Sequence, residues 1–253
     1  MYYGERKVSF DSRLFRLRQR LESGLTMALM IFLFVFTLSV IVYIADIEAH
    51  LLGSASQLND LLAASRETPW GIVTSLFVHA NEGHLSNNMI ALFFFLVFLV
   101  ATNALLPKAE MKKRIFSSSL AIFVVPVVLN VFWISLFPEV KIMGSSGIVY
   151  ALEGSCLGFS MHNALELKRP TTYTSKERRI TLASSLSNIV VCVILLLNLI
   201  VSPETFLGSK FEVVVWLHAL SFCGGLLTAF LYTIYPWTGP ESAVPDKRSK
   251  KGP

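Results

Sequence analysis

The chain has 253 residues, of which 53% are hydrophobic and only 15% are charged, and its mean hydropathy is +0.59. Because soluble domains carry about 25% charged residues, this composition excludes an ordinary soluble protein and predicts a chain solvated mostly by lipid. The three cysteines lie inside apolar runs, which predicts buried free thiols and excludes a disulfide framework or a cysteine metal site.

Six apolar segments are each long enough to cross a bilayer, which takes about 20 residues in a helix. These segments are residues 27–45, 84–106, 115–137, 146–165, 180–201 and 213–235. A basic segment, 1–26, precedes them, and part of it is patterned as an amphipathic helix at the lipid headgroups. Residues 46–79 are expected to form a structured loop, and the polar tail, 238–253, to be disordered. The sequence therefore predicts one all-α membrane domain over residues 27–237.

Lysine and arginine are distributed unevenly among the connecting segments. The N-terminal segment, residues 107–114, residues 168–179 and the tail together hold 19 of the 22 basic residues. Loops rich in Lys and Arg stay on the cytoplasmic side of a membrane. We therefore expect six spans with both termini in the cytoplasm. Since this placement accounts for the net charge of +5, we expect no nucleic-acid partner.

A serine flanked by glycines stands where the fourth predicted span begins. Ser146 lies between Gly144 and Gly147. Peptide hydrolysis by a serine needs an activated hydroxyl and donors for the oxyanion, and the first turn of a helix offers free N–H groups and the positive end of the dipole. The glycines allow another backbone or a substrate to approach closely. On its own, this pattern is a weak signal, and a small-residue helix-packing surface would be the preferred interpretation.

The last predicted span contains a single histidine, His218, in an uncharged run. Its helical face continues through Ser221, Gly225 and Ala229, which are small enough to let another helix approach. The fourth span has a similar face, formed by Gly147, Ala151, Gly154 and Gly158. Packing of these two faces would bring the histidine next to the glycine-flanked serine as its general base. A lone membrane histidine also fits a simple hydrogen bond between helices.

Four further polar residues and one tyrosine accompany this pair. His84 and Asn88 are four residues apart, so both lie on one helix face and can donate hydrogen bonds to an oxyanion. Helix capping or a surface polar patch is the alternative. Tyr150 lies one turn below the serine and can pack against the histidine ring or simply in the core. His79 is expected to support its loop by hydrogen bonding. Glu153 lies about 10 Å below the serine, which predicts a structural or water-holding role.

These motifs together resemble the rhomboid family of intramembrane serine proteases, from about residue 70 to residue 235. The resemblance rests on Trp70 before Thr-Ser-Leu-Phe-Val-His79, His84-Leu-Ser-Asn-Asn88-Met, Gly144-Ser-Ser146-Gly147-Ile-Val-Tyr150, and His218 with Gly225 seven residues later. Three motifs in the right order, on alternate spans, are much more specific than any one of them.

The resemblance implies a six-helix bundle with a dyad of Ser146 and His218. It implies that His84, Asn88 and the Ser146 backbone N–H hold the oxyanion, and that Tyr150 stacks on the catalytic histidine. Rhomboids need no metal or other cofactor and cut transmembrane proteins within the lipid bilayer. The chain departs from the family at Gly71, where many members have Arg, which puts the usual anchoring of that loop in doubt. Two more departures are Ser221, commonly Gly, and Glu153, often apolar.

Two other functions fit the same composition. A catalytically silent rhomboid-like protein would bind membrane clients, although such relatives usually lose the serine or the histidine. A transporter would use Glu153 and the histidines as an ion path. We expect a multi-pass protein of a prokaryotic plasma membrane, because no organelle-targeting signal is evident.

Overall fold

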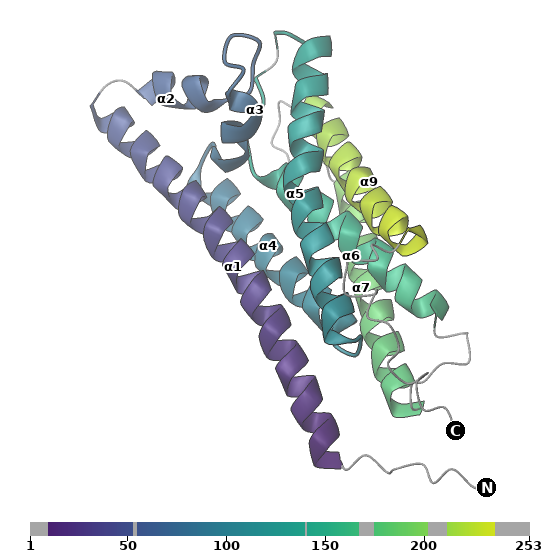
Figure 1. The fold of residues 1–253 in the computed structure, drawn as a ribbon. Helices are drawn as coiled ribbons and strands as arrows, with labels where there is room; N and C mark the ends of the chain where they lie inside the picture. The colour runs from purple at the N-terminus through teal and green to yellow at the C-terminus, as the bar shows by residue number, and fades with distance from the viewer. Residues whose placement is uncertain (1–9, 53–54, 140, 167–174, 202–211, 236–253) are drawn as a thin grey trace, which may run out of the picture.

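A computed structural model describes residues 10–52, 55–139, 141–166, 175–201 and 212–235 (Figure 1). Nearly all of these residues are helical. The elements are α1 (Phe10–Leu51), α2 (Ala55–Leu62), α3 (Gly71–Thr74), the 3-10 helix η1 (Ser75–Phe77), α4 (Glu82–Asn103), α5 (Lys108–Leu136), α6 (Ser146–Glu166), α7 (Ser175–Val201) and α9 (Glu212–Ile234). The tail for which we predict disorder, 238–253, lies outside the described residues.

Five of the described helices, α1, α4, α5, α7 and α9, are long and apolar enough to cross a membrane. The fourth predicted span corresponds to α6, which has 21 residues but is not as apolar as the other five. Its buried residues include Glu153, Ser155 and Ser160. Because neighbouring helices rather than lipid cover this helix, it carries polar groups that a lipid-facing helix would exclude.

Helix α1 is longer than the first predicted span. Its 42 residues amount to about 63 Å at 1.5 Å per residue, roughly twice the thickness of the hydrocarbon core. The helix passes without a break through residue 26, where we predict a boundary between the basic segment and the first span. The segment 46–79 holds the end of α1 and the short elements α2, α3 and η1, so this loop is structured, as predicted.

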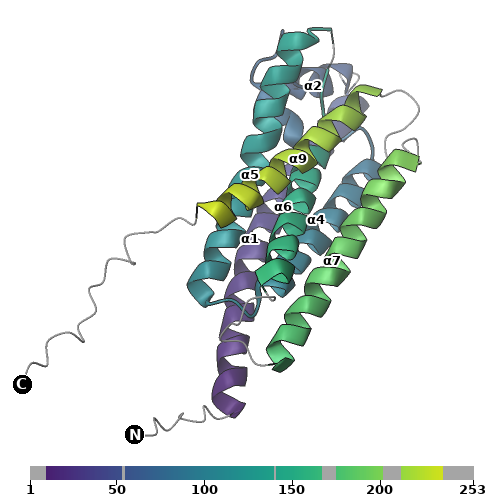
Figure 2. The same ribbon diagram turned by 90° about the vertical axis from the view of Figure 1, so that its right-hand side faces the viewer.

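Helix α6 lies in the middle of the bundle, in contact with α4, α5, α7 and α9 (Figure 2). Its contact with α9 is made by glycines against backbone. A Cβ added at Gly154 would lie 2.0 Å from the Phe222 carbonyl oxygen, and one added at Gly225 would lie 1.9 Å from that of Ala151. Any side chain would therefore force the two helices apart. The predicted packing of the two small-residue faces is confirmed.

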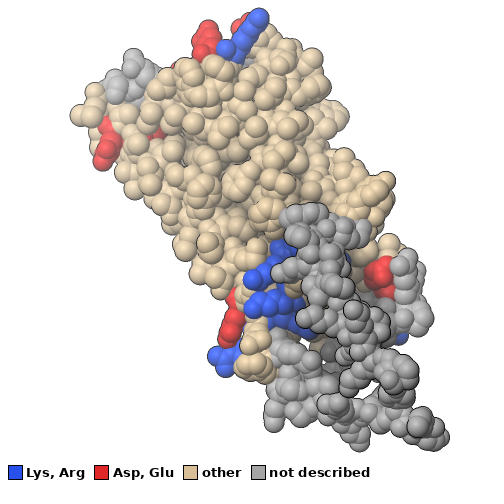
Figure 3. Space-filling view, viewed as in Figure 1, with Lys and Arg blue, Asp and Glu red and all other residues tan. Residues whose placement is uncertain are grey.

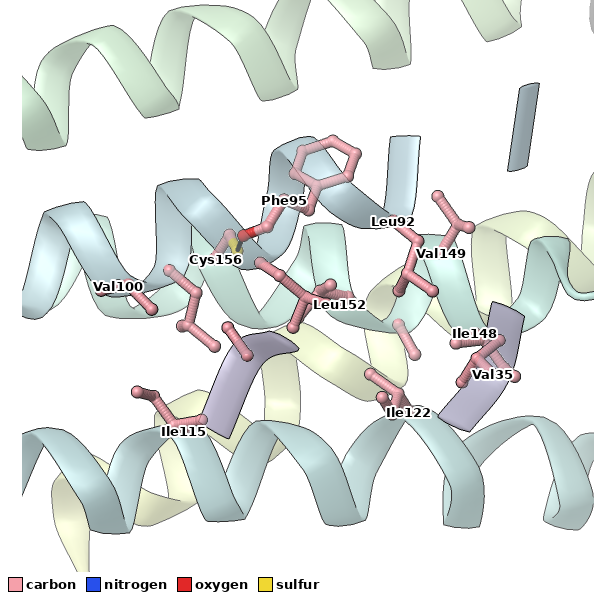
Figure 4. Packing of buried hydrophobic residues seen from close by; sticks show 14 of the residues in the cluster. Val35, Leu92, Phe95, Val100, Ile115, Ile122, Ile148, Val149, Leu152 and Cys156 are labelled. Atoms are coloured by element: carbon pink, nitrogen blue, oxygen red, sulfur yellow. Dashed lines mark hydrogen bonds between the residues drawn. The ribbon is translucent and has the colours of Figure 1, made fainter. Parts of the chain in front are cut away.

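The apolar core surrounds α6 and includes residues of α1, α4, α5, α7 and α9. Figure 4 shows 14 of its residues, among them Val35 on α1, Leu92 on α4, Ile122 on α5 and Leu152 on α6. Cys156 and Cys192 are buried free thiols, as expected, but Cys223 is exposed. The expectation is wrong for Cys223 because this part of α9 turns a side chain outward, and an apolar run does not reveal which face is covered.

Charged side chains are concentrated at the two ends of the bundle. Figure 3 shows Lys and Arg gathered at the end of the molecule where α1 and α5 begin, and a broad band free of charged side chains above them. The basic end includes Arg18, Lys108 and Lys112. A belt of uncharged atoms between polar ends is what a bilayer requires of a protein that it surrounds.

Candidate active site

The irregular segment before α6 places Ser146 at the first position of that helix. The Val149 N–H donates to the Ser145 carbonyl at 3.2 Å, so the N–H of Ser146 precedes the first intrahelical bond and stays free to donate. Gly144 has a φ of 121°, a conformation that L side chains rarely adopt. Its N–H donates to the Ser75 carbonyl at 2.8 Å. The turn that aims the serine therefore depends on glycine.

Ser146 and His218 are in direct contact. The distance from Ser146 Oγ to His218 Nε2 is 2.6 Å, and the two residues are 8% and 4% exposed. Among the described residues, His218 Nδ1 has no hydrogen-bond partner, so no carboxylate orients the ring. Instead, the Tyr150 ring stacks on it, with centroids 4.4 Å apart and planes at 26°. The Ser146 hydroxyl is thus within hydrogen-bond distance of the His218 imidazole, whose orientation is fixed by packing against Tyr150.

His84 and Asn88 both lie on α4, and His84 packs against the glycine turn before Ser146. A Cβ added at Gly144 would lie 3.0 Å from His84 Cε1, 3.4 Å from its Nε2 and 3.6 Å from Ser146 Oγ. Asn88 is buried, and within the described chain its Nδ2 donates to no acceptor. The helix cap is provided by Asn81, whose Oδ1 accepts from the His84 N–H at 2.8 Å. Capping therefore does not account for either predicted donor, and a buried orphan donor needs another explanation.

His79 makes two hydrogen bonds beneath this turn. Its Nε2 lies 2.8 Å from Ser145 Oγ, and its Nδ1 lies 3.2 Å from the Phe77 carbonyl oxygen. Burial, with a smaller contribution from the nearby His84, lowers the pKa of His79 from 6.5 to about 4. The predicted loop-supporting role of His79 agrees with these contacts, but its partner Ser145 was missed.

The loop before α4 is anchored without an arginine at position 71, where many members of the rhomboid family have one. A Cβ added at Gly71 would lie 2.0 Å from the Ala63 carbonyl oxygen, so only glycine fits there. Trp70 Nε1 donates to the Leu61 carbonyl at 2.7 Å, and Thr74 Oγ1 donates to that of Leu62 at 2.8 Å. Close backbone packing and hydrogen bonds to carbonyls thus hold this loop in place.

A second polar cluster, which was not predicted, lies at the opposite end of the helices. Arg114, expected to be a loop charge, is buried and donates to Asn103 on α4 and to Asn163 on α6 at 3.1 and 2.8 Å. It also pairs with Glu110, which accepts a bond from Tyr232 on α9. The two asparagines inside apolar spans were the available signal. The cluster ties four helices together.

Glu153 is 1% exposed, and within the described residues its Oε1 has no partner. It lies on α6, two turns below the serine, with Tyr150 between them along the helix. No group of three or more His, Cys, Asp or Glu residues in the described part of the chain is arranged to hold a metal ion.

A family model described as the Rhomboid domain matches residues 66–235, which is more than half of the chain. The chain belongs to the rhomboid family. The match begins just before Trp70 and ends with α9, so it includes every residue of the site described above. No curated protein and no solved structure matches this rhomboid. Family membership and the five apolar helices together establish an integral membrane protein.

Proposed function

We propose that this rhomboid is an intramembrane serine endopeptidase that hydrolyses peptide bonds of transmembrane proteins through a Ser146–His218 dyad. The observation that carries the proposal is the 2.6 Å contact between Ser146 Oγ and His218 Nε2. Nucleophile and base within hydrogen-bond reach are the signature of an activated serine. The position of Ser146 at the start of a helix, and the buried amide donor of Asn88 that has no partner among the described residues, support an acyl-transfer role for the pair over a purely structural one.

In the first half of the reaction, the Ser146 hydroxyl attacks the scissile carbonyl carbon. His218 Nε2 takes the hydroxyl proton as the new C–O bond forms, and then gives it to the leaving amine as the C–N bond breaks. This proton transfer requires the imidazole to be neutral, with its own proton on Nδ1. Tyr150 keeps the ring in place during both transfers, because the stacked geometry restricts rotation.

The oxyanion formed by this attack is stabilised by His84, Asn88 and the backbone N–H of Ser146. The buried and unpaired Asn88 Nδ2 is set to donate to an acceptor that arrives only with the substrate. Preorganised donors of this kind stabilise an oxyanion most strongly in a site from which water is excluded. Water then attacks the acyl carbon while His218 Nε2 accepts a proton from it. His218 passes this proton to Ser146 Oγ as the acyl C–O bond breaks, which releases the new carboxyl terminus and restores the serine hydroxyl.

The substrates are transmembrane segments, which reach the buried dyad from the surrounding bilayer after partial unwinding. We assign six spans, with the polar α6 as the fourth, and both termini in the cytoplasm, because the basic residues collect at one end of the bundle. A prokaryotic plasma membrane remains our predicted location. The mechanism needs no metal, nucleotide or nucleic acid, since every step uses groups of the chain and water.

The proposal is tested by incubating the purified full chain in liposomes with a reporter transmembrane substrate. Wild type is expected to release two fragments, and Ser146→Ala and His218→Ala are expected to release neither while retaining the wild-type unfolding midpoint. If wild type binds the reporter without cutting it, the protein is a client-binding rhomboid and the proposed activity is wrong. Ion flux that is lost in Glu153→Gln would indicate a transporter instead.

A further inference from the structure

Two consecutive serines at the start of α6 each contact a different histidine. Ser146 contacts His218, and Ser145 contacts His79 at 2.8 Å across 66 positions of sequence. Ser145 and His79 are 0% and 2% exposed, so this second pair has no access to substrate. Because a buried hydrogen bond is costly to break, the pair fixes the position of the residue that immediately precedes the nucleophile.

The direction of this hydrogen bond follows from the second contact of His79. The Phe77 carbonyl can only accept, so the proton of the neutral ring is on Nδ1, and Nε2 accepts from the Ser145 hydroxyl. The carbonyl of Ser145 is also occupied, by the Val149 N–H. That carbonyl and the Ser146 N–H belong to one planar peptide unit. Holding Ser145 by both groups therefore orients the Ser146 N–H, which is a proposed oxyanion donor.

His79 also contacts the other side of the oxyanion site. Its ring packs edge-on against the ring of His84, with centroids 5.3 Å apart and an interplanar angle of 70°. His84 in turn packs over Gly144. His79 thus contacts Ser145, whose peptide bond carries the Ser146 N–H, and also His84. The Ser146 N–H and the His84 side chain are two of the proposed oxyanion donors.

We propose that His79 is a positioning residue which, through Ser145 and His84, fixes two of the oxyanion donors, the Ser146 backbone N–H and the His84 side chain. This inference rests on the proposed protease function. It assigns Ser145 the role of an anchor rather than a reserve nucleophile. The pair therefore affects the rate of acylation and leaves substrate binding unchanged.

The test compares kcat and KM for cleavage of a reporter transmembrane substrate by the purified full chain. Ser145→Ala and His79→Leu are expected to lower kcat about tenfold or more, the effect of one lost buried hydrogen bond, with KM within about twofold. His79→Gln, whose amide reaches the position of Nε2, is expected to recover most of the rate. The double variant is expected to be no slower than the slower single variant, because both remove the same bond.

Ser160→Ala is the matched control for folding. Ser160 is also 0% exposed, lies on α6, and accepts a bond from Asn188 Nδ2 at 2.7 Å. It is expected to lower the unfolding midpoint as much as Ser145→Ala does, with kcat within about twofold of wild type. Equal losses of kcat in the two variants would overturn the positioning role. A raised KM with unchanged kcat in Ser145→Ala would overturn it as well.

Failure of the inference and failure of the proposed function are separable. Substrate cleavage that persists in Ser146→Ala would contradict the protease mechanism itself. Cleavage that requires Ser146, yet is indifferent to Ser145→Ala and His79→Leu, would contradict only the positioning role. A fluorophosphonate adduct on Ser145 in the Ser146→Ala variant would also overturn that role, because Ser145 would then be a nucleophile.

Discussion

An alanine at Gly225 is expected to abolish most of the activity without touching a catalytic side chain. Its Cβ would lie 1.9 Å from the Ala151 carbonyl oxygen, whereas ordinary contact begins near 3.4 Å, so α9 must move from α6 by about 1.5 Å, the difference between these distances. His218 lies two turns away on the same helix. A shift of that size takes its Nε2, now 2.6 Å from Ser146 Oγ, beyond hydrogen-bond range of about 3.2 Å.

A misplacement of about 1 Å can cost about 100-fold in rate, so kcat of Gly225→Ala should fall by about that factor or more. The assay is cleavage of a reporter transmembrane substrate, with the unfolding midpoint measured in parallel. Gly24→Ala on α1 is the control, because its Cβ would meet only side chains, at 3.0 Å from Val100 and 3.2 Å from the end of Met111. A folded Gly225→Ala protein with kcat within about threefold of wild type would refute this account of the α6–α9 contact.

Three further predictions concern other parts of the structure. Asn88→Ala should lower kcat about 100-fold or more, as expected for one oxyanion donor, with little change in KM in the same cleavage assay; an unchanged kcat would remove Asn88 from the site. His79 takes up a second proton only near a pKa of about 4, against 6.5 in the unfolded chain, so the contribution of the neutral ring to stability is complete above pH 6.5. It is lost as the pH falls to 4, by roughly 3 kcal/mol, and unfolding measured over this range should show a smaller loss in His79→Gln. Arg114→Leu should destabilise the fold by roughly 3 kcal/mol, since it leaves Glu110 without its buried partner, and chemical unfolding should show this loss while kcat at permissive temperature stays near wild type.

The contact between Ser146 and His218 was predictable because its geometry is encoded in local spacing. Small residues at helical intervals around Ser146 and His218 specify a close contact between two helices, and close contact at those faces leaves one arrangement for the two side chains. Gly154 and Gly225 pack directly against carbonyl oxygens of the facing helix. The close helix contact therefore requires glycine at the positions where the sequence has it.

Other features depend on tertiary partners that no local pattern reveals. The pairing of Ser145 with His79 joins positions 66 residues apart, and neither residue has a spacing that identifies the other. From the sequence, Arg114 is expected to be an exposed loop charge. Only the structure shows that asparagines on α4 and α6 accept its hydrogen bonds. The need for glycine at position 71 becomes clear only when the Ala63 carbonyl lies against it.

Hydropathy alone does not support the assignment of helix α6 as a membrane span. Hydropathy detects helices that face lipid, and the five outer ones satisfy it. The central helix is covered by protein on several sides, so it retains Glu153 and several serines that lower its apolar character. Its length and its position in the bundle, rather than its composition, support the assignment as a span.

The central claim is that Ser146 is a nucleophile activated by His218, and active-site labelling tests it most directly. Purified protein is treated with a fluorophosphonate, and the modified residue and the labelling rate are determined by mass spectrometry. We expect an adduct on Ser146 in wild type, none in Ser146→Ala, and labelling at least about 1,000-fold slower in His218→Ala. Labelling of Ser146 that is equally fast without His218 would contradict the account.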